Sequence, residues 1–302
     1  MNIAIAGASG FIGRNLSKLA KERGYRVLGL VRSEESKRKI EGLCSMVKVV
    51  DFFDINSLEK AIKNCEIVYH FIGISRESKD ETFEKVNFLL TKLMLEACKR
   101  VRVKRFITNS GLGVANYNKN PFVTNRYFLS KLMAEKIIME KSDEVSYTIF
   151  RPSYILGEED EMTPYLVERI KKGEVTIVGN GEYRFQPIYI KDASEIYLKC
   201  LEVKNSKNTI FDLVGDDIVS YKDYLKMIID RLLKKGEIYK SPKVSFISVE
   251  EAKREDNPLG LAKEEVDVLL CDELSDSTKI KETFNIRLTP LKEILDRIIF
   301  GP

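Results

Sequence analysis

Short, almost wholly apolar segments alternate with amphipathic ones through the first half of the chain. The apolar segments are typical of strands and read NIAIAG (2–7), YRVLGLVR (25–32), MVKVVD (46–51), EIVYHFIG (66–73), KRFITNS (104–110) and VSYTIFRPS (145–153). A strand that is apolar along its whole length needs cover on both faces, and parallel strands need crossover helices between them. The alternation therefore predicts an α/β fold with a doubly wound parallel sheet.

Helices are expected between these strands, and a looser pattern follows the last of them. The first helix ends at Gly24, and two longer helices are predicted at 80–100 and 124–141. The pattern after the sixth strand predicts a helix (162–172), a glycine-marked turn (178–184), a strand (187–190), a helix (192–202), a strand (208–215) and then helices with loops.

The predicted division into lobes follows from this order, because no Pro/Gly linker separates a second domain. The sheet domain is assigned to residues 1–153 and is completed by segments at about 187–215. A small C-terminal lobe is assigned to residues 154–186 and 216–302.

Length and composition exclude several classes of protein. The 302 residues are 44% hydrophobic, which suffices for a large α/β unit and exceeds any small disulfide-stapled scaffold. No apolar run reaches the length of a membrane span, and a strand beginning at residue 2 leaves no room for a signal peptide. Five scattered cysteines without CxxC spacing predict a reduced, cytoplasmic protein with no metal site.

The charge balance argues against a nucleic-acid partner. Fifty basic and 46 acidic residues give a net charge of +4, which indicates a mixed surface. The densest basic stretch, KRVRVKR (99–105), lies between a predicted helix and a predicted strand. It is interpreted as a solvated connector.

A glycine-rich turn follows the first strand and opens the first helix. It reads GASGFIG and contains Gly7, Gly10 and Gly13. In that context the glycines allow a tight turn, a close approach of backbone to a pyrophosphate, and close packing of helix on strand. Main-chain N–H groups and the positive helix end favour the phosphate charge. The turn therefore predicts a Rossmann-type dinucleotide site.

The end of the second strand bears on which dinucleotide binds. An NAD-specific protein usually places a carboxylate there for the ribose 2′-hydroxyl, but this chain has Arg32 followed by Ser33. A guanidinium suits a 2′-phosphate, so NADP(H) is predicted, with NAD(H) as the alternative. Asp51, at the end of the third strand, either contacts the adenine edge or caps a turn.

Three motifs in order resemble one family. GASGFIG, YFLSK (127–131) and RPS (151–153) together resemble the short-chain dehydrogenase/reductase superfamily in its extended and atypical branches. TNSGLG (108–113) and RFQPIYIKDAS (184–194) are most similar to the atypical group that contains the NADPH-holding accessory subunit of respiratory complex I. The resemblance covers about residues 1–215.

The resemblance makes Tyr127 the general acid–base residue and Lys131 its partner. A tyrosine and a lysine four residues later share one helical face, and the ammonium is expected to lower the pKa of the phenol. The family's third catalytic residue, a Ser or Thr, falls at Gly111 here, and Ser110 lies one residue early. A one-residue shift along a strand turns a side chain to the other face, so Ser110 is a weaker candidate.

The remaining site residues follow from the same resemblance. The cofactor site is completed by residues of the glycine turn, the third and fourth strand ends and the sixth strand end, namely Ser9, Phe11, Ile12, Phe52, Ile72, Gly73, Lys131, Pro152 and Ser153. Asn87, Arg184 and Gln186 are candidates to face the substrate, although Arg184 and Gln186 could instead tie the lobes together. The single histidine, His70, is interpreted as a packed strand residue.

Two classes of function stay open. The first is an oxidoreductase that acts on a small carbonyl, quinone or sugar-like molecule, with a nucleotide-sugar epimerase or dehydratase as a lesser form. The second is a structural or redox-sensing protein that binds the cofactor without turnover, like the complex I subunit. The first expects a small-molecule substrate, and relatives that pair through two long helices suggest a homodimer.

Overall fold

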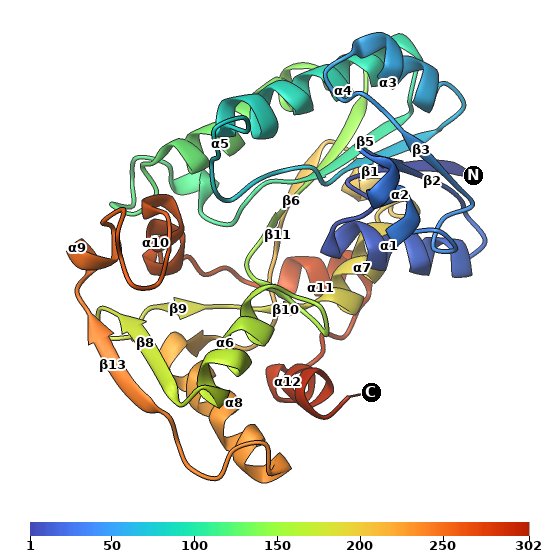
Figure 1. Cartoon of the computed structure of the whole chain (residues 1–302). Coiled ribbons are helices and arrows are strands. Elements are labelled where there is room, and N and C mark those ends of the chain that lie inside the picture. The colour runs from blue at the N-terminus through green and yellow to red at the C-terminus, as the bar shows by residue number, and fades with distance from the viewer. Residues whose placement is uncertain (302) are drawn as a thin grey trace.

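Seven strands form one parallel sheet at the centre of the protein (Figure 1). The computed structural model describes residues 1–301. The strands are β1 (Asn2–Ala6), β2 (Arg26–Val31), β3 (Met46–Val49), β4 (Ile67–His70), β5 (Arg105–Asn109), β6 (Ser146–Pro152) and β11 (Thr209–Leu213). Their order is β11-β6-β5-β4-β1-β2-β3, and every pair is parallel. The predicted doubly wound Rossmann sheet is confirmed.

Helices cover both faces of this sheet. One face carries α1 (Phe11–Glu22), α7 (Ile190–Lys199) and α11 (Thr278–Phe284), and the other carries α3 (Ile55–Ile62), α4 (Leu90–Arg100) and α5 (Arg126–Glu140) (Figure 1). A short helix, α2 (Glu34–Lys39), joins β2 to β3. The predicted helix at 80–100 is present but begins as a π-helix over Glu84–Leu89.

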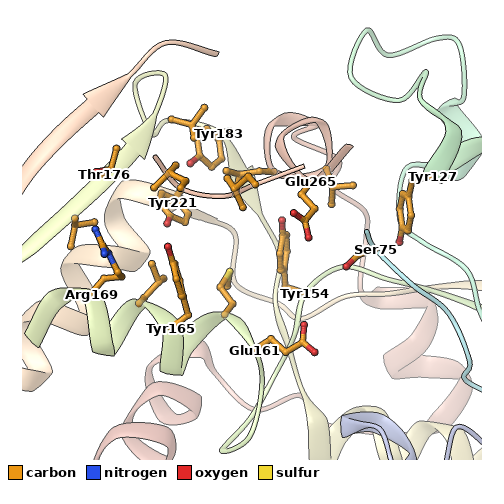
Figure 2. Close-up of a pocket in the computed structure, with 18 residues that line it drawn as sticks. Ser75, Tyr127, Tyr154, Glu161, Tyr165, Arg169, Thr176, Tyr183, Tyr221 and Glu265 are labelled. Atoms are coloured by element: carbon orange, nitrogen blue, oxygen red, sulfur yellow. The ribbon is translucent and has the colours of Figure 1, made fainter. Parts of the chain in front are cut away.

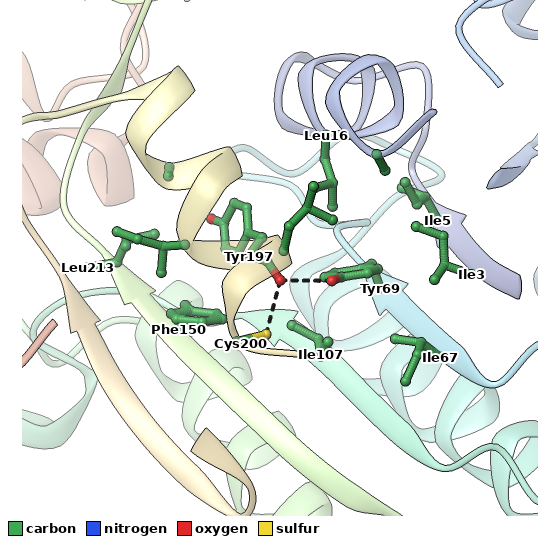
Figure 3. Packing of buried hydrophobic residues seen from close by; sticks show 14 of the residues in the cluster. Ile3, Ile5, Leu16, Ile67, Tyr69, Ile107, Phe150, Tyr197, Cys200 and Leu213 are labelled. Atoms are coloured by element: carbon green, nitrogen blue, oxygen red, sulfur yellow. Dashed lines mark hydrogen bonds between the residues drawn. The ribbon is translucent and has the colours of Figure 1, made fainter. Parts of the chain in front are cut away.

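A buried aromatic cluster joins α7 to the sheet. The Tyr69 hydroxyl of β4 donates a hydrogen bond to the Tyr197 carbonyl of α7 at 2.7 Å (Figure 3). The Tyr197 ring lies edge-on to Phe150 of β6, with ring centroids 5.1 Å apart. Because each tyrosine in a dry core needs a partner for its hydroxyl, these contacts fix the helix relative to the strands.

The strand order sets the position of a ligand crevice. The chain winds outward in one direction through β1, β2 and β3 and then in the other through β4, β5 and β6, so the connections diverge between β1 and β4. In open α/β sheets the crevice at such a switch point, at the carboxyl ends of the strands, is where ligands bind. The loops after β1, β4 and β5 all begin at this edge.

The remaining elements form a smaller lobe beside the carboxyl edge of the sheet (Figure 1). They are β7 (Ile155–Leu156), α6 (Met162–Lys171), β8 (Glu174–Val178), β9 (Arg184–Phe185), β10 (Ile188–Tyr189), β12 (Val219–Ser220), α8 (Tyr221–Lys235), β13 (Lys243–Ile247), α9 (Val249–Ala252), α10 (Lys263–Leu270) and α12 (Leu291–Phe300). The predicted lobe boundaries stay a prediction.

Two expectations about these segments are wrong. Residues beyond 216 are not only helices and loops, because β13 pairs in parallel with β8. The basic stretch 99–105 is not wholly solvated, since Arg105 is 3% exposed and donates hydrogen bonds to Thr148 and to the Cys200 carbonyl. Within residues 1–301, no helix combines the length and apolar character needed to cross a membrane.

Candidate active site

The glycine turn between β1 and α1 is shaped by its lack of side chains. Gly7 has a φ of +84°, and its carbonyl accepts a hydrogen bond from the Gly10 N–H at 3.0 Å. A Cβ on Gly13 would lie 2.2 Å from the Gly7 carbonyl oxygen, which no real structure tolerates. The start of α1 therefore packs directly on the turn, and the helix N-terminus points its free N–H groups toward the crevice.

A groove of about 770 Å³ runs along this edge and is called the switch-point groove. Eight residues predicted for the cofactor line it, namely Gly7, Ser9, Gly10, Arg32, Asp51, Phe52, Ile72 and Gly73. The other predicted residues lie outside its wall. Phe11 and Ile12 pack against the core of the smaller lobe, and Pro152 and Ser153 line a separate cavity beside Tyr127.

Three predicted cofactor residues near the ends of β2 and β3 contact other residues of this chain. The Arg32 side chain is 73% exposed and pairs with Glu81 at 2.6 Å. The Asp51 carboxylate accepts a hydrogen bond from the Phe53 N–H at 2.9 Å, so it caps the turn after β3 while still lining the groove. Ser33 accepts a hydrogen bond from the Ser36 N–H at 3.1 Å and caps α2.

Tyr127 and Lys131 reach the ends of two central strands. Tyr127 Oη lies 3.7 Å from the Cβ position of Gly111, just after β5. Lys131 Nζ lies 2.8 Å from the Cβ position of Gly73, after β4, and 5.9 Å from the centroid of the Tyr127 ring. Asn125 caps α5 by accepting the Phe128 N–H, which sets where this helix begins. One helix therefore carries both groups to the crevice.

Burial controls the protonation of this pair. Desolvation raises the pKa of Tyr127 to about 12, with a smaller contribution from Cys271. Desolvation lowers the pKa of Lys131 to about 8, opposed by Glu135. The expectation that the ammonium lowers the pKa of the phenol is therefore wrong for this state of the site. Lys131 Nζ is turned toward Gly73, and the loss of water around the phenol dominates.

Ser110 is buried next to both groups. Its Oγ has no hydrogen-bond partner within residues 1–301, and its N–H donates to the Phe150 carbonyl at 2.7 Å. Ser110 lines the cavity of about 150 Å³ beside Tyr127, and also a small cavity that Lys131 lines. Gly111 lines the same cavity, and its Cβ position lies 3.7 Å from Tyr127 Oη.

The three residues predicted to face a substrate make other contacts. Asn87 bonds both backbone groups of Ile74 and the Ser130 hydroxyl, at 2.8 to 3.1 Å, and so joins the loop after β4 to α5. Gln186 donates to the Gly215 carbonyl and accepts the Ser275 N–H, which ties the lobes together.

Arg184 forms a two-pronged contact with Asp272 while lining the cavity beside Tyr127. His70 is 1% exposed, and its Nε2 lies 3.1 Å from the Thr91 hydroxyl. Desolvation lowers the pKa of His70 to about 3, so the ring is neutral. It is a packed strand residue.

The family model for the NAD dependent epimerase/dehydratase family matches residues 3–213. The chain belongs to this family. The matched region spans the whole sheet, the glycine turn, α5 and the strand end at Pro152.

Known members and structures are similar at a distance. The chain is 27% identical over 236 residues to the Arabidopsis thaliana mitochondrial protein named NADH dehydrogenase [ubiquinone] 1 alpha subcomplex subunit 9, covering 76% of this chain and 57% of that one. It thus spans little more than half of that relative's length. It is 24% identical over 258 residues to a farnesyl-dihydroquinoline-oxide ketoreductase of Stigmatella aurantiaca, covering 80% and 76%.

One solved structure shares the whole fold. The UDP-glucuronic acid 4-epimerase of Bacillus cereus, solved with UDP-glucuronic acid and NAD, superimposes with a TM-score of 0.78 at 22% identity, covering 100% of this chain and 98% of that one. At this identity the likeness establishes the fold alone.

Sequence reasoning missed a further pocket of this chain, here called the tyrosine pocket (Figure 2). It holds about 320 Å³ and is lined by Ser75, Tyr127, Tyr154, Glu161, Met162, Tyr165, Leu166, Arg169, Val175, Thr176, Val178, Tyr183, Tyr221, Leu259, Leu261, Glu265, Val268 and Leu269. Tyr127 contributes to its wall, so the pocket adjoins the candidate site. Several of its walls come from residues beyond 213, where the family match ends.

Proposed function

We propose that the protein is an NADP(H)-dependent oxidoreductase of the short-chain type that interconverts a ketone and a secondary alcohol. The observation that carries the proposal is the position of Tyr127 and Lys131. Tyr127 lines the tyrosine pocket, and Lys131 packs on Gly73, which lines the switch-point groove. A bound nicotinamide ring supplies the hydride to the carbonyl carbon, or accepts it in the reverse direction.

Tyr127 supplies the matching proton. With a pKa raised to about 12, its hydroxyl is protonated at neutral pH and can donate to a carbonyl oxygen. Lys131, with a pKa of about 8, is mostly charged at pH 7, and its ammonium would have to turn from Gly73 toward the phenol to stabilise the phenolate that proton donation leaves behind. In the oxidative direction the same phenolate takes the proton from the alcohol.

The groove suits a dinucleotide phosphate. The backbone at Gly7, Gly10 and Gly13 leaves a cradle that side chains would fill, at the N-terminus of a 12-residue helix. Arg32 supports a 2′-phosphate, because its exposed pair with Glu81 contributes only about 0–1 kcal/mol and can be exchanged for a dianion.

Substitution of Arg32 tests the cofactor preference. Arg32→Ala should weaken NADPH binding by about 10-fold or more and leave NADH binding nearly unchanged, measured by titration calorimetry. Arg38→Ala, at another exposed arginine of the same region, serves as the control and should change neither affinity. A preference for NADPH that is absent, or that survives Arg32→Ala intact, contradicts the assignment.

Substitution of Tyr127 tests the chemistry. The NADPH-loaded protein is mixed with a panel of ketones, quinones and nucleotide sugars, and the absorbance of NADPH is followed through one turnover. Tyr127→Phe should slow the oxidation of NADPH by about 10²-fold or more without changing NADPH affinity. Tyr239→Phe, at a tyrosine that is 95% exposed, is the matched control.

A second candidate function is cofactor binding without turnover. Gly111 favours it, because a missing donor beside the substrate oxygen typically costs about 10²–10³ in rate. The Arabidopsis relative is named as a subunit, which also supports it. Tight NADPH binding with no oxidation across the whole panel would select this function.

Nucleotide-sugar epimerisation is the lesser alternative, supported by the fold shared with the Bacillus cereus enzyme. The cytoplasmic location stays a prediction, since the Arabidopsis relative is named as mitochondrial. The homodimer stays a prediction as well.

A further inference from the structure

The tyrosine pocket has a distinct chemistry at each end. Tyr127 stands at one end, and Arg169 of α6 stands at the other, beside Tyr165 and Thr176 (Figure 2). Between them the wall is built mostly from aliphatic and aromatic side chains, contributed by α6, β8, α8 and α10. A bound molecule that reacts at Tyr127 and fills the pocket must therefore be elongated and largely apolar in its middle.

Two tyrosine hydroxyls of the pocket can donate hydrogen bonds to a ligand. Tyr183 Oη is buried and has no hydrogen-bond partner within the described chain. Burial raises the pKa of Tyr183, and raises that of Tyr221 to about 12, so both hydroxyls are neutral donors at neutral pH. An unpaired buried hydroxyl costs free energy that a ligand's acceptor oxygen recovers.

Arg169 is the one cation in the pocket wall, and it has no partner. It is partly buried, and within residues 1–301 its guanidinium makes neither a hydrogen bond nor an ion pair. Glu265 is occupied elsewhere, because it pairs with Arg76 and accepts the Ala262 N–H at 2.9 Å. A guanidinium facing a mostly apolar space favours an anion there, and its fork matches a carboxylate.

The charges of the wall disfavour a diphosphate. Glu161 and Arg169 are the two charged side chains of the wall without an ion-pair partner within residues 1–301, because Glu265 is paired with Arg76. A nucleoside diphosphate carries at least two negative charges and would meet one cation and one unpaired carboxylate in this wall. A single carboxylate is matched by Arg169 alone, so the rest of the bound molecule is expected to be uncharged.

We propose that the tyrosine pocket takes an elongated apolar ketone or secondary alcohol that carries one carboxylate, with the reacting oxygen at Tyr127 and the carboxylate held by Arg169. This inference rests on the proposed function for the identity of the reacting group. Arg169 is then a specificity-determining residue, and the aliphatic wall selects for the length of the molecule.

A binding experiment tests this without requiring turnover. The NADP⁺-loaded protein is titrated by calorimetry with decanoic acid carrying a methyl ketone at its far end, and with the methyl ester of that keto acid. The acid should bind about 10-fold or more tightly than the ester, because a charge-assisted pair to Arg169 is lost in the ester. Each methylene removed from the chain should weaken binding by about 3-fold.

The variants separate Arg169 from general effects of charge. Arg169→Gln should weaken binding of the acid by about 10-fold or more and leave the ester unchanged, whereas Arg287→Gln, at an exposed arginine outside the pocket, should change neither. Equal affinity for acid and ester, an equal loss for both ligands in Arg169→Gln, or tighter binding of UDP-glucose than of the keto acid each overturns the inference.

Turnover distinguishes this inference from the proposed function. If the keto acid binds through Arg169 but neither it nor any compound of the panel oxidises NADPH, the pocket assignment stands and the proposed function fails. If other carbonyls are reduced while the keto acid does not bind, the proposed function stands and the pocket assignment fails.

Discussion

At Gly111 a hydrogen atom occupies the place where a hydroxyl would face Tyr127. A Cβ there would meet Tyr127 Oη and a methyl group of Val114 at 3.7 Å each, which is ordinary contact, and Gly111 is not among the glycines with a positive φ. Gly111→Ser should therefore fold normally and raise the turnover number of the proposed reaction by about 10-fold or more, by adding a donor to the substrate oxygen.

Gly111→Ala is the matched control for this prediction, because it adds the same carbon without the hydroxyl. Steady-state rates with the best substrate of the panel give the comparison. Equal rates for the serine and alanine variants would show that position 111 does not address the reacting oxygen.

Individual site residues were predictable to different degrees. The spacing of Tyr127 and Lys131 could be read from the sequence because four residues make one helical turn. The direction of the Tyr127 pKa could not, since it depends on burial by segments far along the chain, such as the one carrying Cys271. The contacts of Asn87 and Gln186 likewise depend on which backbone groups the fold brings to their amides.

Among the elements, α1 is held by a contact that only glycine permits. Gly13→Ala would place a carbon 2.2 Å from the Gly7 carbonyl oxygen, and backbone on both sides must shift to relieve the overlap. We expect a loss of stability of about 3 kcal/mol and a loss of NADPH binding, measured by urea unfolding and calorimetry.

Gly24→Ala at the other end of α1 is the control for this prediction. Gly24 has a φ of +81° but nothing within 4 Å of its Cβ position, so only backbone strain of about 1 kcal/mol is expected. NADPH affinity should be unchanged in this variant. If Gly13→Ala also keeps wild-type affinity, the close packing of α1 on the turn does not shape the groove.

Elements of the sheet were predictable mainly because inner strands such as β1, β2 and β4 are buried along most of their length. The edge strand β3 has no fully buried residue and β11 is only partly buried, but both lie in segments that the sequence analysis assigned to strands. The strand β13 was missed because its pattern is mostly exposed, with Val244 and Phe246 both facing water. Its residues do alternate polar and apolar, but only over Lys243 to Phe246 and with the apolar face turned to water, so the pattern did not single out a strand.

At the scale of the whole molecule, helix α11 from the last part of the chain packs into the core of the sheet against β6 and β11. Phe284 of α11 packs on Phe211 and Phe150, with ring centroids 5.0 and 6.2 Å away. Phe284→Ala should lower the free energy of unfolding by about 3–5 kcal/mol. Far-UV circular dichroism and tyrosine fluorescence should shift together if the sheet and the smaller lobe unfold in one transition, because the three rings lie in the core of the sheet.

Phe300→Ala, at a phenylalanine that is 41% exposed on α12, should change stability by less than about 1 kcal/mol. Two separate transitions in either variant would show that the lobes unfold independently.

The tyrosine pocket is the part of the molecule that sequence reasoning could not reach. Its walls come mainly from α6, β8, α8 and α10, which are dispersed over more than a hundred residues, and among its tyrosines Tyr127 is the one that the sequence analysis assigned to the site. The family resemblance could point to Tyr127 and Lys131, because they share one helix and lie at two strand ends. It gave no information on a cavity formed only when a less regular lobe folds against them.

At Gly73 the requirements of folding differ from those of the proposed reaction. Alanine at this position would contact only the tip of the flexible Lys131 side chain and the amide of Asn87, so the chain would lose little stability. The ammonium, however, would be pushed away from its place beside the groove. Under the proposed function, the bare backbone at residue 73 therefore serves the reaction and not the fold, and a melting curve would not detect its loss.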